Sequence, residues 1–355
     1  MRIPLLILIL FAGTVKSVQH PVSRSLAGPP IEIRLIGAST PAMESRIAEI
    51  QDRFPQLQRR RASHFEMLTD LDPTEAGRHT ELLERTSLAV DRFCDLIGVA
   101  HGHGGDGRHL VLGFADRMDF LQFAAWSDDV HARWLAGYFA PAAGHLAYHH
   151  QSDSPYVRSQ RRWIDHTRDR GNAVEDADLE RLVDDDRRRR LNTFVAQETS
   201  SIVVHEAVHM LLHNRGIVPA TTSTPIWFLE GLAGSFEPAS AYGPFGPDHG
   251  VNGRTDEFRR HLSGNRQFGI EEMVTLDAVP KRSDQRNSFY ATSAQFCGWL
   301  VRHRPDDVRR FIDVVKHGSG EDRLANFEAV FGPCAGIERI WLTDERARAS
   351  HDTDR

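Results

Sequence analysis

Two histidines four residues apart in an apolar segment constrain this chain more than any other feature. The segment spans residues 201–212 and carries the sequence HEAVH at 205–209, with apolar side chains on most of the surrounding positions. Residues four apart lie on one face of a helix, so His205 and His209 can offer imidazole nitrogens to a single cation. The apolar neighbours predict a buried helix, and Gly216 predicts where it ends.

A glutamate 21 residues after the second histidine completes a ligand set. Glu230 lies in WFLEGLA at 227–233, among apolar and small residues where an unpaired buried carboxylate would be costly. A catalytic Zn²⁺ takes three protein ligands, of which two histidines and a glutamate are a standard set, and leaves a fourth position for water. We therefore expect His205, His209 and Glu230 to bind one Zn²⁺ per chain, and Glu206 to act as general base toward the bound water. The alternative is a helix whose polar residues satisfy one another without a metal.

Together, HEAVH and WFLEGLA resemble the gluzincin group of zinc metallopeptidases, in which a distal glutamate joins the HExxH helix. The likeness is nearest to the peptidase-MA-like branch, where the third ligand lies in a W-x-x-E-G-x-A element, and to secreted bacterial proteins of that type classed only as a domain of unknown function. It covers residues 194–236 and, more loosely, 288–301. The resemblance implies metal ligands at His205, His209 and Glu230, a general base at Glu206, and hydrolysis of peptide bonds.

The same resemblance supplies one further candidate catalytic residue. In aminopeptidase-like gluzincins a tyrosine some sixty residues after the glutamate ligand donates its hydroxyl to the oxyanion of the tetrahedral intermediate. Tyr290 lies 60 residues after Glu230 and opens an amphipathic pattern at 290–301, which predicts a helix start facing the cleft. Such a donor is worth about 3 kcal/mol in the transition state. The alternative is a tyrosine that anchors a packed helix through its ring.

Departures from the family patterns narrow the expected activity. The G-x-M-E-N stretch with which aminopeptidases hold a free amine has no counterpart between residues 171 and 202, so an endopeptidase is favoured over an exopeptidase. The acid that thermolysin-like enzymes place four residues after the glutamate ligand is replaced by Gly234. Glu237 is a substitute that could orient a histidine, although Pro238 makes it equally suited to a helix end. Two other functions stay open: a zinc-binding envelope protein without proteolytic activity, and a zinc hydrolase of a non-peptide amide or ester.

The first residues predict export. Residues 1–17 have a positive start, an apolar core and a small-residue site before Val18, as in a cleavable signal peptide, and the apolar run is short for a bilayer span. We therefore expect a periplasmic, cell-surface or extracellular protein with no stable membrane span after cleavage; the alternative is an N-terminal segment that is kept as an anchor. Three cysteines are too few for a disulfide framework, although one bridge is open to them.

Composition supports a globular enzyme acting on a peptide or protein substrate. The chain has 355 residues, of which 40% are hydrophobic and 26% charged, enough to bury a sizeable core. Its formal net charge of −6, with both signs interspersed, argues against nucleic-acid binding. Nothing in the sequence indicates the oligomeric state.

The remaining pattern predicts an α+β, zincin-like fold: a mixed sheet with the active-site helix, followed by a mainly helical C-terminal lobe. The expected parts are a signal peptide (1–17), an α/β lobe ending in the HExxH helix (18–215), and a helical lobe carrying the third ligand (216–355). Strands are predicted at 31–37, 62–71, 109–113 and 144–150, and helices from Asp72 to Gly98 and at 116–126. The gluzincin resemblance makes the strand at 144–150 the candidate sheet edge for an extended substrate, and the alternative is a strand in the sheet interior. Residues 151–190 are so highly charged that they predict a solvated helical linker.

Overall fold

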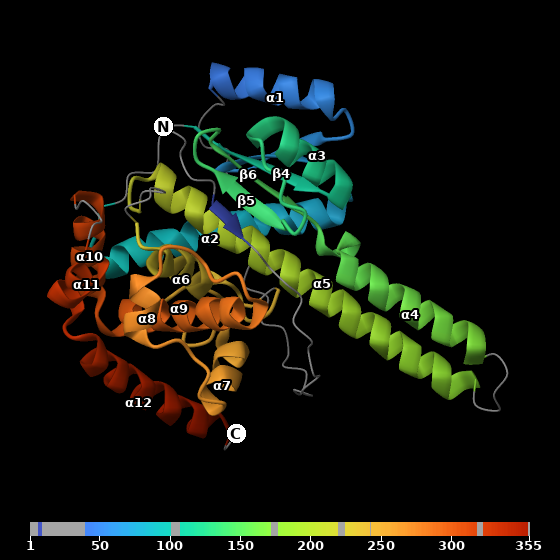
Figure 1. Ribbon diagram of the computed structural model, residues 1–355. Coiled ribbons are helices and arrows are strands. Elements are labelled where there is room, and N and C mark those ends of the chain that lie inside the picture. The colour runs from blue at the N-terminus through green and yellow to red at the C-terminus, as the bar shows by residue number, and fades with distance from the viewer. Residues whose placement is uncertain are drawn as a thin grey trace.

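The computed structural model describes residues 6–8, 40–100, 107–171, 177–218, 224–241, 243–317 and 322–353. The predicted strand at 31–37 lies outside these residues, as does the predicted signal peptide at 1–17 except for the short strand Leu6–Leu8. The described part of the chain confirms the expected α+β class (Figure 1).

A mixed sheet forms the core of the N-terminal half. Its strands follow the order β1-β5-β6-β4-β3-β2, in which β3, β4 and β6 run parallel and the other neighbours run antiparallel. The strands are β1 (Leu6–Leu8), β2 (Gln58–Arg61), β3 (Phe65–Thr69), β4 (His109–Phe114), β5 (Gly137–Ala140) and β6 (His145–His149).

Helices cover both faces of this sheet, which is why its central strands are buried along almost their whole length. Successive residues alternate between two cores: Met67 and Val111 face the core shared with α2 and α5, whereas Leu68 and Leu112 face the core shared with α1 and α3. The helices of this half are α1 (Pro41–Arg53), α2 (Pro73–Ile97), α3 (Arg117–Asp128), α4 (Pro155–Gly171) and α5 (Ala177–Asn214), with a 3₁₀ turn at Gln151–Asp153.

Helix α2 begins and ends where the sequence predicts. The Asp72 carboxylate accepts hydrogen bonds from the backbone amides of Thr74 and Glu75, and Pro73 occupies the first turn. Gly98 ends the helix in the left-handed conformation, with φ of 67°.

The predicted edge strand is wrong. β6 lies between β4 and β5, so the segment at 144–150 is interior to the sheet. A tight turn with Gly144 at φ of 69° folds the chain back from β5 to β6, and this hairpin places β5 on the outer side. The edge of β5 is paired with Leu6–Leu8.

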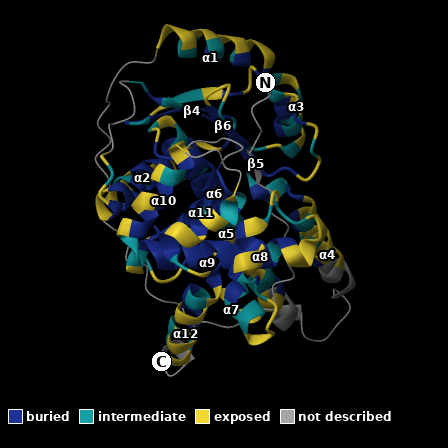
Figure 2. Cartoon of the chain, turned by 60° about the vertical axis from the view of Figure 1, so that its left-hand side comes forward, coloured by how far each residue is buried: buried dark blue, intermediate teal, exposed yellow. Residues whose placement is uncertain are grey.

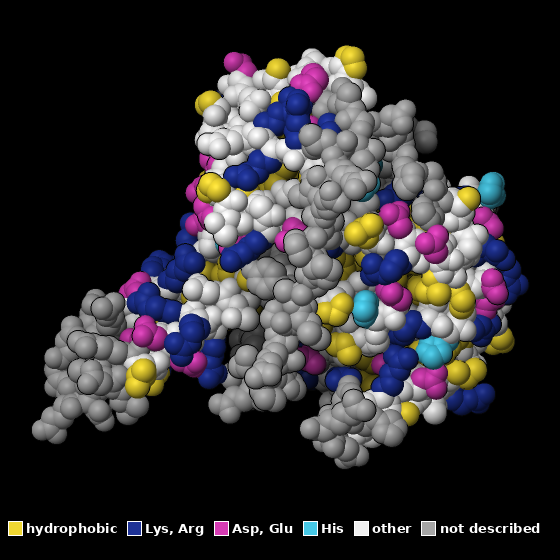
Figure 3. Space-filling view, turned by 180° about the vertical axis from the view of Figure 1, so that it is seen from behind, with side chains coloured by type: hydrophobic (Ala, Val, Ile, Leu, Met, Phe, Trp, Pro, Cys, Tyr) yellow, Lys and Arg dark blue, Asp and Glu magenta, His cyan; other side chains and the backbone are white. Residues whose placement is uncertain are grey.

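The charged segment before the HExxH sequence is a helical hairpin. α4 and the first half of α5 run side by side and project from the body (Figure 1), and many Lys and Arg side chains line this projection with Asp and Glu among them (Figure 3). A small core of Val157, Ile164, Leu191 and Val195 joins the two helices. α5 is therefore one helix of 38 residues rather than a linker followed by a short helix.

The C-terminal half is helical within the described residues, as predicted. At its centre, α6, α9 and the second half of α5 are largely buried (Figure 2). Its helices are α6 (Ile226–Phe236), α7 (Thr255–Ser263), α8 (Ile270–Thr275), α9 (Ser283–His303), α10 (Pro305–His317), α11 (Arg323–Phe331) and α12 (Cys334–Thr353).

Cys94, Cys297 and Cys334 are buried and free, so no disulfide forms among them. Among the described residues, no helix combines the length and apolar character needed to cross a membrane.

Candidate metal centre

Helices α5 and α6 bring the three predicted ligands together. The ligand atoms of His205, His209 and Glu230 all lie within 4.8 Å of one another, and the three side chains are buried. One Glu230 oxygen is 3.2 Å from His205 Nε2, and the other is 3.9 Å from His209 Nε2. The two imidazole rings come from adjacent turns of α5, with centroids 4.8 Å apart. This buried group could hold a metal ion.

Two glycines allow the close packing that positions these ligands. A Cβ on Gly137 of β5 would lie 2.6 Å from Ile202 Cγ2, so a glycine there lets α5 approach the sheet. A Cβ on Gly231 would lie 2.6 Å from the backbone oxygen of Ser293, so α6 packs directly against the backbone of α9. Since Gly231 follows Glu230, the same close packing fixes the position of the third ligand.

On the side of its ring opposite Glu230, His205 contacts a buried ion pair formed by Glu237 and Arg254. Its Nδ1 lies 2.9 Å from Glu237 Oε1, so Glu237 is placed to orient this histidine, one of the two roles that the sequence left open. Glu237 is also a helix-end residue: it is the C-cap of α6, with its amide bonded to the Gly234 carbonyl. The Arg254 guanidinium, just before α7, donates to Glu237 Oε1 at 2.9 Å and lies 2.8 Å from Oε2. Arg254 could not be predicted from the sequence, because a lone arginine in a loop has no local pattern that marks its partner.

The carboxylates of Glu230 and Glu237 around His205 favour a positive charge at the site. Burial lowers the pKa of His205, but hydrogen bonds to Glu230 and Glu237 outweigh it and raise that pKa to about 10. Burial, with the neighbouring His205, holds the pKa of His209 well below its usual range. The imidazolium of His205 therefore directs one N–H toward each carboxylate, and a divalent ion could replace the Nε2 proton that faces Glu230. Neither ring nitrogen of His209 has a hydrogen-bond partner among the described residues, so Nε2, which lies 3.9 Å from Glu230 Oε1, is available to a metal.

Glu206 is a buried carboxylate beside the ligand group. Burial raises its pKa to about 8, partly offset by His205 and by the nearby Phe139 backbone on β5. Despite that proximity, neither carboxylate oxygen makes a hydrogen bond of normal geometry with any described residue. A buried, unsatisfied carboxylate is costly, so its occurrence next to two histidines favours a functional explanation.

Tyr290 is close to the site but not at the start of a helix. α9 begins at Ser283, so Tyr290 lies in its third turn, and the predicted helix start is wrong. The first turns of α9 consist mainly of polar residues, so the apolar periodicity begins only near Tyr290 and the true start of the helix was missed. The Tyr290 ring is buried, with its centroid 6.4 Å from that of His205 and the Arg254 guanidinium 5.4 Å away over its face.

Comparison with known proteins adds one match. The model of a family described as a protein of unknown function (DUF1570) matches residues 199–320. That span contains the three ligands, Glu206, Glu237, Arg254 and Tyr290. No curated protein matches the chain.

Proposed function

We propose that this chain is an exported zinc-dependent metallopeptidase that cleaves within peptide chains. The observation that carries the proposal is the buried convergence of His205, His209 and Glu230 with the unsatisfied carboxylate of Glu206 beside them. Two histidines and one carboxylate are a ligand set of catalytic zinc and leave a position for water. The gluzincin resemblance of the HEAVH and WFLEGLA segments supports the same assignment.

Each residue of the site has a separate task in this proposal. Bound zinc supplies a Lewis acid and lowers the pKa of water. Glu206 accepts the proton of the attacking water and passes it to the leaving amine. The Tyr290 hydroxyl donates to the oxyanion that develops on the carbonyl. Glu237 fixes the ring of His205, and Arg254 fixes Glu237.

We further propose that an extended substrate binds along β5. This strand contacts α5 directly, and its Phe139 backbone lies near Glu206. The edge of β5 carries Leu6–Leu8, which fall in the segment predicted to be cleaved on export. Removal of that segment frees the edge for a peptide, which strand addition would recognise mainly through its backbone.

The deciding experiment compares the purified chain with its Glu206→Gln variant. Zinc content is measured by atomic emission and hydrolysis by release of peptides from casein. We expect equal zinc in both proteins and cleavage by the wild type alone, because the amide of glutamine cannot take the proton. Glu271→Gln, an exposed carboxylate on α8, is the matched control and should cleave normally.

Two results would count against the proposal. Cleavage by Glu206→Gln at the wild-type rate would remove Glu206 from the mechanism. Zinc binding without cleavage of any peptide would favour a non-proteolytic zinc protein, or, if simple esters or amides are hydrolysed, the non-peptide hydrolase.

A further inference from the structure

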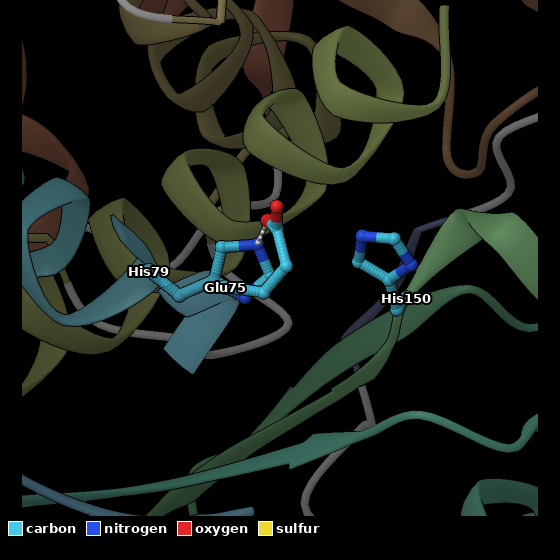
Figure 4. Close-up of side chains that lie close together, drawn as sticks. All are labelled: Glu75, His79 and His150. Atoms are coloured by element: carbon cyan, nitrogen blue, oxygen red, sulfur yellow. Dashed lines mark ion pairs between the residues drawn. The ribbon is translucent and has the colours of Figure 1, made fainter. Parts of the chain in front are cut away.

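A second group of metal-ligating side chains lies outside this centre. Glu75 and His79 come from the first turns of α2, and His150 directly follows β6 (Figure 4). One ligand atom from each of the three lies within 4.8 Å of the other two. We propose that Glu75, His79 and His150 form a second metal site, which binds a divalent transition-metal ion of the Zn²⁺ class. It shares no residue with the first site and lies outside the span of the family match.

The geometry needs only a small adjustment to hold a metal. Glu75 and His79 are four residues apart on one helical face, with Oε2 and Nε2 separated by 3.9 Å. The rings of His79 and His150 are nearly parallel, with centroids 5.9 Å apart. Bonds of 2.0–2.1 Å and tetrahedral angles imply ligand atoms about 3.3 Å apart, so the three groups must draw together. Glu75 can supply its part of this movement because its side chain is 26% exposed, although it must give up or share its ion pair with Arg78, and His150 must move toward His79.

Both histidines are oriented by hydroxyl groups on their Nδ1 atoms. His79 Nδ1 lies 2.7 Å from the Tyr148 hydroxyl, and His150 Nδ1 lies 2.7 Å from the Ser152 hydroxyl. When Nδ1–H of His79 donates to the Tyr148 hydroxyl, the Nε2 lone pair of His79 is left for a metal. His150 Nδ1 also accepts from the Ser152 backbone amide at 3.3 Å, so metal binding requires the tautomer in which its Nδ1–H donates to the Ser152 hydroxyl instead. Figure 4 shows a ring nitrogen of His150 turned toward the other two residues.

Burial keeps the imidazoles of His79 and His150 neutral. Burial lowers the pKa of His79 to about 3 and also lowers that of His150. Neutral imidazole is the form that binds transition metals. The positive charges of Arg78 and Arg161 disfavour a cation at this position. The negative charges of Asp72 and Glu75 favour one.

A metal at this position would join three elements of the fold. It would tie the start of α2 to the end of β6, and the next residue, Gln151, already donates its backbone amide to Thr199 of α5. Thr199 is six residues before His205, or about 9 Å along the helix axis. The second site is therefore a cross-link beside the active-site helix.

The test is the difference in Zn²⁺ bound per chain between wild type and His150→Ala after equilibrium dialysis. We expect the variant to bind one ion fewer, whether or not the first site is occupied, so this result does not depend on the proposed function. Equal binding by the two proteins would overturn the second site. His131→Ala, an exposed histidine, is the control and should match the wild type.

A second variant keeps the test valid if His150→Ala fails to fold. Glu75→Gln removes one ligand from a partly exposed position, and Glu81→Gln changes an exposed glutamate on the same helix. In competition with a chelator, we expect Glu75→Gln to weaken one of the zinc sites at least tenfold and Glu81→Gln to leave both unchanged. Identical affinities in the two variants would overturn the proposal.

Discussion

A buried ion pair between Glu237 and Arg254 distinguishes this site from one that has only the HExxH motif. Arg254 and His205 both bond Glu237, and the pKa of Glu237 is lowered because these cationic partners outweigh burial. A carboxylate behind a histidine ligand makes the ligand more basic and fixes its tautomer. The pair therefore belongs to the metal centre although neither member would touch the metal.

Glu237→Gln should weaken metal binding without displacing the ligands. Glutamine keeps an oxygen that can accept from His205 but loses the negative charge, so we expect zinc affinity to fall about 10- to 100-fold. Competition with a chromogenic chelator measures the change. An affinity within twofold of the wild type would mean that Glu237 has only a packing role.

Arg254→Met should destabilise the fold more than it affects the ligands. Removal of the guanidinium leaves Glu237 charged and buried with one partner fewer, which costs about 3–5 kcal/mol. Urea unfolding of the zinc-free protein measures this loss. The double variant with Glu237→Gln should recover part of it, since both charges are then gone; a strictly additive loss would contradict the coupling.

The sequence could reveal some residues of the site and not others for a physical reason. His205, His209 and Glu206 share one helix, and Glu230 is marked by the cost of burying a carboxylate in an apolar segment, so local pattern suffices. Arg254 meets Glu237 only through the path of the loop at 238–253. His79 and His150 come together only through the packing of α2 on the sheet, which no local spacing encodes.

At the scale of elements, the packing of α6 on α9 decides where the third ligand lies. Gly231→Ala would push a methyl group into the Ser293 backbone, which cannot yield as a side chain could. We expect a loss of about 1–3 kcal/mol in unfolding free energy, together with weaker zinc binding. Gly336 of α12 has open space around its Cβ position, so Gly336→Ala should be neutral or stabilising. Equal effects of the two substitutions would show that α6 can shift freely.

The ends of a helix could be predicted from the sequence where a capping residue marks them, whereas the order of the strands could not. Asp72 and Gly98 fix both ends of α2 through their own backbone and side-chain preferences. The position of β5 between β1 and β6 depends on a four-residue strand and a turn, and the length of α5 depends on its packing against α4. Both are set by contacts between segments, so periodicity alone could not show that the strand at 144–150 is interior to the sheet.

The stability of the whole molecule should fall as the solution becomes mildly acidic. Burial, Arg215 and His64 lower the pKa of His109 to about 4, whereas an unfolded histidine protonates near pH 6.5. Between these values the unfolded chain binds more protons, so stability present above pH 6.5 is lost as the pH falls toward 4. His109 should account for about 1–2 kcal/mol of the loss between pH 7 and pH 5. In urea unfolding at both pH values, His109→Gln should show a smaller loss than the wild type; an equal loss would contradict this role.

The projecting hairpin should be separable from the folding of the rest of the molecule. Asp165 and Arg188 form an ion pair across it at 2.7 Å, so the two helices can be joined there by a short turn. Replacing residues 168–185 with Gly-Ser-Gly removes the tip but keeps the core of Val157, Ile164, Leu191 and Val195, which supports α5 before it enters the body. We expect unchanged zinc content and a melting temperature within about 4 °C of the wild type, measured by atomic emission and circular dichroism. Loss of zinc from the shortened protein would mean that the distal half of α5 helps to hold His205 and His209 in place, and that the hairpin and the metal centre fold as one unit.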